Sequence, residues 1–146
     1  MKLTQFSDYS LRVLLYLGLK KDQATVAEIS QNFKISRNHL VKVVHQLGKN
    51  GMLKSLKGKD GGILLEPHVL QMKIGEIILK TEPNFHIVEC FDKNTNTCPI
   101  VGVCALEKSL QEAFLSFIAS LNRQTLGDLL KSPAIDTRKK ILGISY

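Results

Sequence analysis

The stretch ISRNHLVKVVHQLGKNGMLKSLKGKDGGILLE, residues 35–66, decides the fold. Its first half has the apolar spacing of a helix that runs from Arg37 to about Asn50. Ser36 stands in the capping position before this helix, and Gly51 is the expected stop. The helix is followed directly by a basic segment of a different kind.

That segment has the pattern of a β-hairpin. Two strand-like runs, residues 52–56 and 63–66, lie on either side of a basic, glycine-rich tip. A helix followed by such a hairpin is typical of a winged helix-turn-helix, in which the helix enters the major groove of DNA and the wing follows the duplex.

Two helices are expected before this stretch. The first runs from a cap at Ser7 or Asp8 to about Lys20, with leucines at three- and four-residue steps. Thr25 caps a second, shorter helix through about Phe33. With the turn that follows, they complete the helix-turn-helix of a mainly α fold with a small β-hairpin wing.

The helix that begins at Arg37 has an apolar face and, opposite to it, a basic face. A basic face usually meets only water, but next to a basic wing we interpret it as a DNA surface. The predicted base contacts are Ser36, Arg37, Asn38 and His39. The predicted backbone contacts are Lys42, Lys49, Lys54, Lys57 and Lys59, with Gly61, which also suits the turn at the tip.

The composition fits these interpretations. Twenty Lys and Arg against thirteen Asp and Glu give a formal charge of +7, which attracts polyanions such as nucleic acid. No apolar run is long enough to span a membrane, and the N-terminus lacks the pattern of a secretory signal. We therefore expect a cytoplasmic protein whose cysteines stay reduced.

After the wing, the spacing predicts a helix from Met72 to Thr81 and a long helix from about Cys104 to Asn122. The long helix has a broad apolar stripe: Leu106, Leu110, Ala113, Phe114, Phe117, Ile118 and Leu121. This stripe must pack either on the core of its own chain or on a second copy. A homodimer is favoured because paired half-sites on DNA need two recognition helices related by a two-fold axis.

The three cysteines, Cys90, Cys98 and Cys104, have the spacing C-x(7)-C-x(5)-C. Three interpretations are open: a metal or cluster site, three unrelated thiols, or a reactive thiol pair. Structural zinc usually has four protein ligands, often in close C-x(2)-C pairs, which are missing here. An iron–sulfur cluster accepts looser spacing and a fourth ligand other than cysteine.

Several segments together resemble one family. These are FSDYSLRVLLYL (residues 6–17), the helix ISRNHLVKVVHQLGKNG, the wing GKDGGILL and three cysteines just before a long helix. They resemble the IscR and NsrR group of winged-helix iron–sulfur repressors, of the Rrf-two type, over residues 1 to about 131. The segments NHLVKVV and FHIVECF, with Asp8, resemble the nitric-oxide-sensing NsrR branch more closely than IscR.

The resemblance implies a homodimer that binds double-stranded operator DNA while its iron–sulfur cluster is intact and releases it when the cluster is lost or nitrosylated. Cys90, Cys98 and Cys104 match the ligand positions of a cluster, expected to be 4Fe-4S, with 2Fe-2S as the alternative. Asp8 of the partner subunit matches the fourth ligand, although a helix cap would also explain Asp8. His86 and Glu107 are reserve ligands.

This resemblance divides the chain into four regions. They are a winged helix-turn-helix DNA-binding domain, 1–82; a cluster-binding cysteine loop, 83–104; a dimerisation helix region, 105–131; and a C-terminal tail with few features, 132–146.

Other functions stay open. The same fold suits an IscR-type regulator of cluster supply or redox stress, a cysteine thiol-switch repressor without a cluster, or a module that binds a protein partner. An enzyme with a reactive cysteine is not expected, because His86 is the one base near the thiols in sequence.

Overall fold

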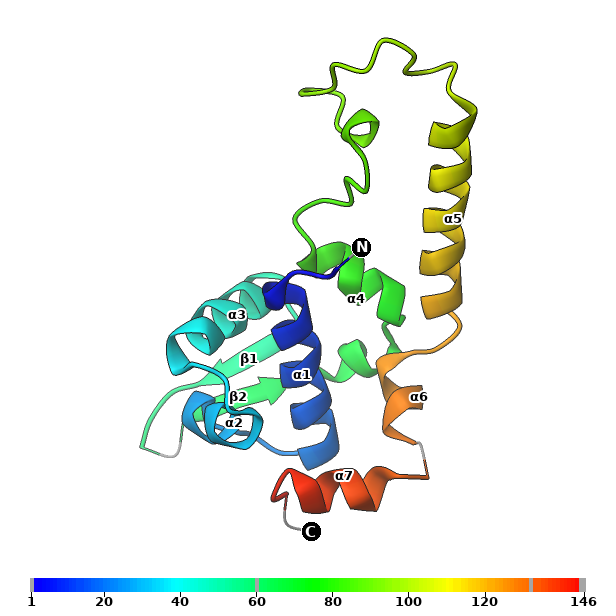
Figure 1. The fold of residues 1–146 in the computed structure, drawn as a ribbon. Helices are drawn as coiled ribbons and strands as arrows, with labels where there is room; N and C mark the ends of the chain where they lie inside the picture. Colours follow the sequence, from blue (N-terminus) through cyan, green and yellow to red (C-terminus); the bar gives the residue numbers. More distant parts are fainter. Residues whose placement is uncertain (1, 60, 132, 145–146) are drawn as a thin grey trace.

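The computed structural model of the 146-residue chain describes residues 2–59, 61–131 and 133–144. A long helix and an irregular loop project from a helical body with α1 at its centre (Figure 1). The helices are α1 (Gln5–Lys20), α2 (Val26–Phe33), α3 (Arg37–Lys49), α4 (Ile74–Thr81), α5 (Ala105–Leu121), α6 (Leu126–Leu130) and α7 (Ile135–Ile141). The strands are β1 (Leu53–Leu56) and β2 (Gly62–Leu65), and the 3-10 helices are η1 (Pro67–Gln71) and η2 (Glu89–Phe91). The predicted fold class, mainly α with a two-stranded wing, is confirmed.

The core lies between α1, α3 and α4. Leu14, Leu17, Leu40, Leu47 and Ile77 are almost completely buried there. Each of these residues lies on the apolar face of its helix, so burial of these faces fixes how the three helices pack. The outer face of α3 stays free of the core.

The N-terminus of α1 differs from the prediction. Thr4, not Ser7 or Asp8, caps the helix: its hydroxyl accepts a hydrogen bond from the backbone N–H of Ser7 at 3.2 Å. Ser7 is fully buried, and Asp8 lies inside the helix in its first turn. The helix begins earlier because the extended backbone of Thr4 offers a cap before Ser7 is reached.

A polar network attaches α2 to α1. The buried Tyr16 hydroxyl donates to Glu28 Oε1 at 2.7 Å and accepts from Asn32 Nδ2 at 2.9 Å, and Lys20 Nζ lies 2.6 Å from the same Glu28 oxygen. Burial raises the pKa of Tyr16, and hydrogen bonding to Glu28 adds to this shift. Burial alone would raise the pKa of Glu28, but the hydrogen bonds from Lys20 and Tyr16 outweigh it and lower that pKa.

Replacing Tyr16 by phenylalanine is expected to reduce the free energy of unfolding by about 2 kcal/mol, because Glu28 and Asn32 lose their shared buried partner. The loss should appear in urea denaturation at pH 7. It should shrink as the pH falls through the lowered pKa of Glu28, because the carboxylate is then protonated and the ionised form that the Tyr16 hydroxyl stabilises is lost. Tyr9→Phe is the matched control in the same helix, and an equal loss in both variants would contradict a specific role for the network.

The wing is anchored to the rest of the domain. β1 and β2 pair antiparallel, from Leu53 opposite Leu65 to Leu56 opposite Gly62. Ile63 also exchanges two backbone hydrogen bonds with Ala24, at 2.8 and 3.0 Å. A Cβ at Gly62 would lie 2.9 Å from the Ala24 carbonyl oxygen, so this close approach requires glycine. Each strand begins or ends within one residue of its predicted bounds.

The long helix α5 packs on the body only through its C-terminal half and projects beyond it (Figure 1). Its apolar stripe is divided. Ile118 is buried and Phe114 packs against Phe85, with ring centroids 4.9 Å apart and the rings tilted, so these two residues pack on their own chain. Leu106 is 65% exposed and Ala113 is exposed as well. These two residues, one above the other on the helix, form an uncovered apolar line on α5.

The C-terminal tail is not featureless. Residues 135–141 form α7, which packs across α1, and Ile144 just beyond it is only 6% exposed. The Arg138 guanidinium also donates to the Leu129 carbonyl at 3.1 Å. The sequence did not predict this helix because seven residues are too few for a clear apolar period. Residues 132, 145 and 146 of the tail lie outside the described residues.

Candidate functional site

The first turn of α3 presents four polar side chains to solvent. Ser36, Arg37, Asn38 and His39 are all exposed, while the next residue, Leu40, is fully buried and fixes the helix to the core. Ser36 occupies the cap position without a capping hydrogen bond from its side chain. These are the residues that the sequence predicts to contact bases, and the structure places them together at one end of α3.

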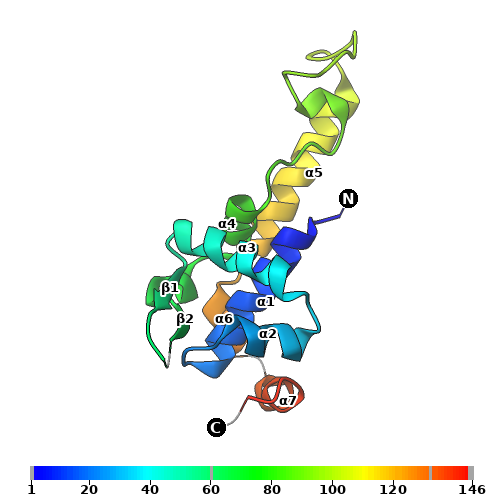
Figure 2. The same cartoon turned by 90° about the vertical axis from the view of Figure 1, so that its left-hand side faces the viewer.

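The predicted phosphate contacts extend from α3 onto the wing. All five lysines are exposed: Lys42, Lys49, Lys54, Lys57 and Lys59. Figure 2 shows α3 and the wing side by side on one face of the molecule. No Asp or Glu occurs from residue 29 to residue 59, so no carboxylate of this segment opposes the positive charge.

Gly61 has a clear structural role at the wing tip. A Cβ at this position would lie 2.6 Å from the Leu56 carbonyl oxygen and 2.8 Å from that of Gly58. The Gly61 N–H also donates to the Gly58 carbonyl at 3.0 Å, which closes the turn. Residue 60, beside it, lies outside the described residues.

The three thiols lie in the irregular loop at the far end of α5 (Figure 1). Cys90 belongs to η2, and Cys104 is the N-cap residue of α5, as the sequence predicts. All three cysteines, including Cys98, are free and partly exposed. As the N-cap residue, Cys104 lies at the N-terminal end of the α5 dipole.

Side chains inside the loop hold its shape. Glu89 accepts hydrogen bonds from the Thr97 hydroxyl at 2.7 Å and from the Thr97 N–H at 2.8 Å, and these bonds lower the pKa of Glu89. Asn96 accepts from the N–H of Cys98 at 3.0 Å. Glu107, in the first turn of α5, accepts from the N–H of Gly102 at 2.9 Å.

The thiols are near enough to influence one another. Partial burial, the nearby Glu107 carboxylate and the charges of Cys98 and Cys104 raise the pKa of the Cys90 thiol. Across the residues that the structure describes, however, no three His, Cys, Asp or Glu side chains lie close enough together to hold a metal ion. The single chain therefore gathers the thiols in one loop without closing them into a site. Three free thiols are suitable ligands for iron, which would displace their protons on binding.

Asp8 lies on α1, apart from this loop. Its two carboxylate oxygens accept from the Arg12 guanidinium at 2.7 and 3.1 Å, and both side chains are more than 40% exposed. The alternative role of Asp8 as a helix cap is wrong, because Thr4 is the cap. Arg12 was not singled out in the sequence, although its position four residues after an aspartate is the usual signal for a helical ion pair.

The reserve ligands also have partners of their own. His86 Nδ1 lies 3.6 Å from Asp92 Oδ2, and Glu107 is bonded to Gly102 as described above. Glu107 is the carboxylate whose charge acts on Cys90 within the chain, whereas Asp8 is not among the groups that shift the pKa of that thiol.

One solved structure and two sequence relatives are similar to this chain over most of its length. IscR from T. potens superimposes with a TM-score of 0.69 over 90% of this chain and 87% of that structure, at 21% identity, which shows the shared winged-helix fold. The HTH-type transcriptional regulator NsrR of Bacillus subtilis is 44% identical over 134 residues, covering 90% of this chain and 92% of that protein. NsrR of Halalkalibacterium halodurans is also 44% identical, over 132 residues, covering 89% and 90%.

The Rrf2 family, described as an iron-dependent transcriptional regulator, matches residues 3–132. This match and the NsrR relatives confirm the resemblance seen in the sequence, and they confirm that the chain is a transcriptional regulator rather than an enzyme. The chain therefore belongs to the Rrf2 family of iron-dependent transcriptional regulators.

Proposed function

We propose that the protein is a dimeric, DNA-binding repressor that senses nitric oxide through an iron–sulfur cluster and acts in the cytoplasm. The observation that supports this most directly is the collection of three free cysteines in one loop at the end of α5, in a chain that resembles NsrR over most of its length. None of the helices formed by the described residues is long and apolar enough to span a bilayer.

DNA is bound by residues 1–82. In this proposal α3 lies in the major groove, Ser36 to His39 contact base edges, and the lysines of α3 and the wing contact phosphates. Support comes from the exposure of these side chains and from the lack of carboxylates between residues 29 and 59. A protein that makes several phosphate contacts should lose affinity steeply as the salt concentration rises.

Dimerisation uses the uncovered line of α5, within residues 105–131. Leu106 and Ala113 are exposed apolar residues. They lie on a different face of α5 from Ile118, which is buried within its own chain. A second copy related by a two-fold axis would cover this line and would place two recognition helices over paired half-sites.

Within the cysteine loop, residues 83–104, Cys90, Cys98 and Cys104 would hold the cluster, expected to be 4Fe-4S with 2Fe-2S as the alternative. Asp8 of the partner subunit would supply a fourth, oxygen ligand, and to do so its carboxylate must leave Arg12. The bound cluster supplies iron with which nitric oxide reacts. Loss of one hard, weakly held ligand would then free the end of α1.

The test is a measurement of iron and acid-labile sulfide per protomer after purification without oxygen, for the wild type and for Cys98→Ser. Equal iron and sulfide in the wild type, lost in the variant, would support the cluster. Weaker binding to operator DNA after titration with nitric oxide would support the sensing role. If the wild type binds operator DNA while it contains zinc or no metal, a thiol switch is favoured instead. The partly exposed free thiols are suited to such a switch.

Two substitutions on α3 should have different effects. Lys42→Ala should weaken binding to every duplex and reduce the slope of log K against log salt by about one, because one phosphate contact is lost. Asn38→Ala should cost about 1–3 kcal/mol with the preferred base at one position and little elsewhere. Titrations at several salt concentrations, with single-base variants of the site, separate the two. The reverse pattern would mean that α3 lies differently in the groove.

Asp8→Ala should leave three thiol ligands and nearly unchanged stability, because the Asp8–Arg12 pair is exposed to solvent. The cluster should become less stable, and the concentration of nitric oxide needed to release half of the bound DNA should rise at least tenfold. Asp22→Ala, an exposed aspartate beyond the other end of α1, is the control. An unchanged cluster and an unchanged response would exclude Asp8 as a ligand.

A further inference from the structure

The N-terminus of α1 is held by a residue far away in the sequence. The first N–H groups of a helix have no partner inside the helix. In the usual capping box, a Glu or Gln at the third helical position accepts the N–H of the cap residue. In α1 this third position is Ser7, whose short side chain has no carboxylate or amide oxygen to accept the Thr4 N–H. The carboxylate of Glu82, 78 residues along the chain, takes this role.

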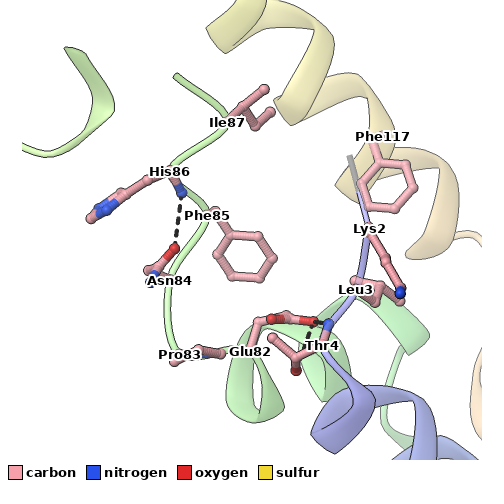
Figure 3. Close-up of a pocket in the computed structure, with 10 residues that line it drawn as sticks. All are labelled: Lys2, Leu3, Thr4, Glu82, Pro83, Asn84, Phe85, His86, Ile87 and Phe117. Carbon is pink, nitrogen blue, oxygen red and sulfur yellow. Dashed lines mark hydrogen bonds between the residues drawn. The ribbon is translucent and has the colours of Figure 1, made fainter. Parts of the chain in front are cut away.

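The geometry at Glu82 is specific. Its Oε1 accepts from the backbone N–H of Thr4 at 2.7 Å, and the Thr4 hydroxyl lies 3.3 Å from the same oxygen (Figure 3). The negative charge lies at the positive end of the α1 dipole, which strengthens these hydrogen bonds. Thr4 uses the same hydroxyl to cap Ser7, so Glu82 fixes the cap itself.

Glu82 is also where the cysteine loop begins. It is the residue that follows α4, and its N–H donates to the Ile78 carbonyl at 2.9 Å. Pro83 comes next and restricts Glu82 to an extended backbone, observed at φ −80 and ψ 134. The backbone of Glu82 therefore belongs to the root of the loop, while its side chain holds α1.

The next residues attach this root to α5. The Phe85 ring packs at a tilt against Phe114 of α5, and Asn84 accepts a hydrogen bond from the N–H of His86 at 3.3 Å. A cavity of about 250 Å³ separates this segment from Leu3 and Phe117, which leaves room for the segment to shift (Figure 3). Cys90 follows eight residues after Glu82. A displacement of the loop between Glu82 and Cys90 must therefore act on the hydrogen bonds to Thr4.

The other end of this path is the recognition helix. Tyr9, one turn and a half after the Thr4 cap, lies against His39 in the first turn of α3, with ring centroids 6.3 Å apart. The α1 helix also packs along α3. A change in the position of the α1 N-terminus is thus passed to the residues proposed to contact bases.

We infer that Glu82 is a positioning residue that couples the cysteine loop to the recognition helix through the cap of α1. This inference rests on the proposed function, because coupling requires two states of the loop with different affinities for DNA. A residue with only a structural role would change the affinity of both states equally. Glu82 should change the ratio between them.

The experiment compares the full-length dimer as wild type and Glu82→Ala. The probe is a duplex selected from random sequence by the cluster-loaded wild type. Its Kd is measured with loaded protein and with nitric-oxide-treated protein, after iron and sulfide have been determined. We expect equal iron and sulfide in both proteins and a ratio of the two Kd values that is at least tenfold smaller in the variant. In cluster-free protein, the amide hydrogens of Thr4 and Ser7 should exchange faster in the variant.

Two further variants sharpen the test. Glu112→Ala, an exposed glutamate on α5, should behave as wild type. Glu82→Gln keeps the oxygen acceptor without the charge and should reduce the Kd ratio about threefold, and this variant decides the matter if Glu82→Ala does not fold. A wild-type ratio in the Glu82 variants would overturn the coupling while leaving the proposed function intact. A ratio of one in the wild type would instead overturn the proposed function, and the coupling with it.

Discussion

Placing a glutamate at Ala113 should convert the dimer into a monomer and weaken operator binding by at least about 100-fold. Ala113 is exposed on α5, in line with Leu106 and Leu110, so the new side chain should not disturb the fold of the single chain. In a two-fold dimer the substitution would introduce two charges into an apolar contact, where an unpaired charge is strongly unfavourable. The loss of affinity follows because a monomer binds one half-site and loses the gain of simultaneous binding.

Ala119→Glu is the matched control for this prediction. Ala119 is also exposed on α5, but helix geometry places it about 120° around the helix axis from Ala113, away from the line of Leu106 and Ala113. Light scattering after gel filtration should show a dimer for the wild type and for Ala119→Glu, and a monomer for Ala113→Glu. A dimer of Ala113→Glu with wild-type operator affinity would mean that another surface joins the subunits.

The sequence was sufficient for the parts of the fold that depend on local pattern. The bounds of α3, its stop at Gly51 and the hairpin with its glycine tip all follow from apolar period and turn chemistry within a few residues. Because α3 is fixed by Leu40 and Leu47 on one side, the exposed position of the predicted DNA contacts on the other side follows as well. The family resemblance also came from such local segments.

The parts that the sequence did not predict depend on distant contacts. The cap at Thr4 is completed by Glu82, and no local spacing relates the two residues. The division of the α5 stripe depends on where Phe85 and α4 lie. The sequence places the three thiols in one loop, but their spacing does not determine whether they come close enough to hold a metal, and among the described residues of the single chain they do not.

The tail is the clearest case of structure created by long-range packing. Residues 135–141 form the short helix α7, which has few apolar side chains, and a helix of this length is unstable in isolation. It forms because Ile135 and Leu142 pack against the core and Ile144 is buried as part of that core. Residues 133–144 lie outside the part of the chain that the family match covers.

Removing residues 132–146 should therefore reduce the free energy of unfolding by about 3–5 kcal/mol, since it uncovers apolar surface of α1 and removes a buried isoleucine. Two point variants test whether packing is the cause. Ile144→Ala, at a residue that is 6% exposed, should cost about 2 kcal/mol, whereas Ile141→Ala, at a residue that is 76% exposed, should cost almost nothing. Chemical denaturation of the three proteins at one protein concentration gives these values. Equal effects of the two point variants would show that α7 does not pack on α1 in solution. Equal effects would also remove the reason to expect that the tail supports the helix on which Thr4, Asp8 and Tyr9 lie.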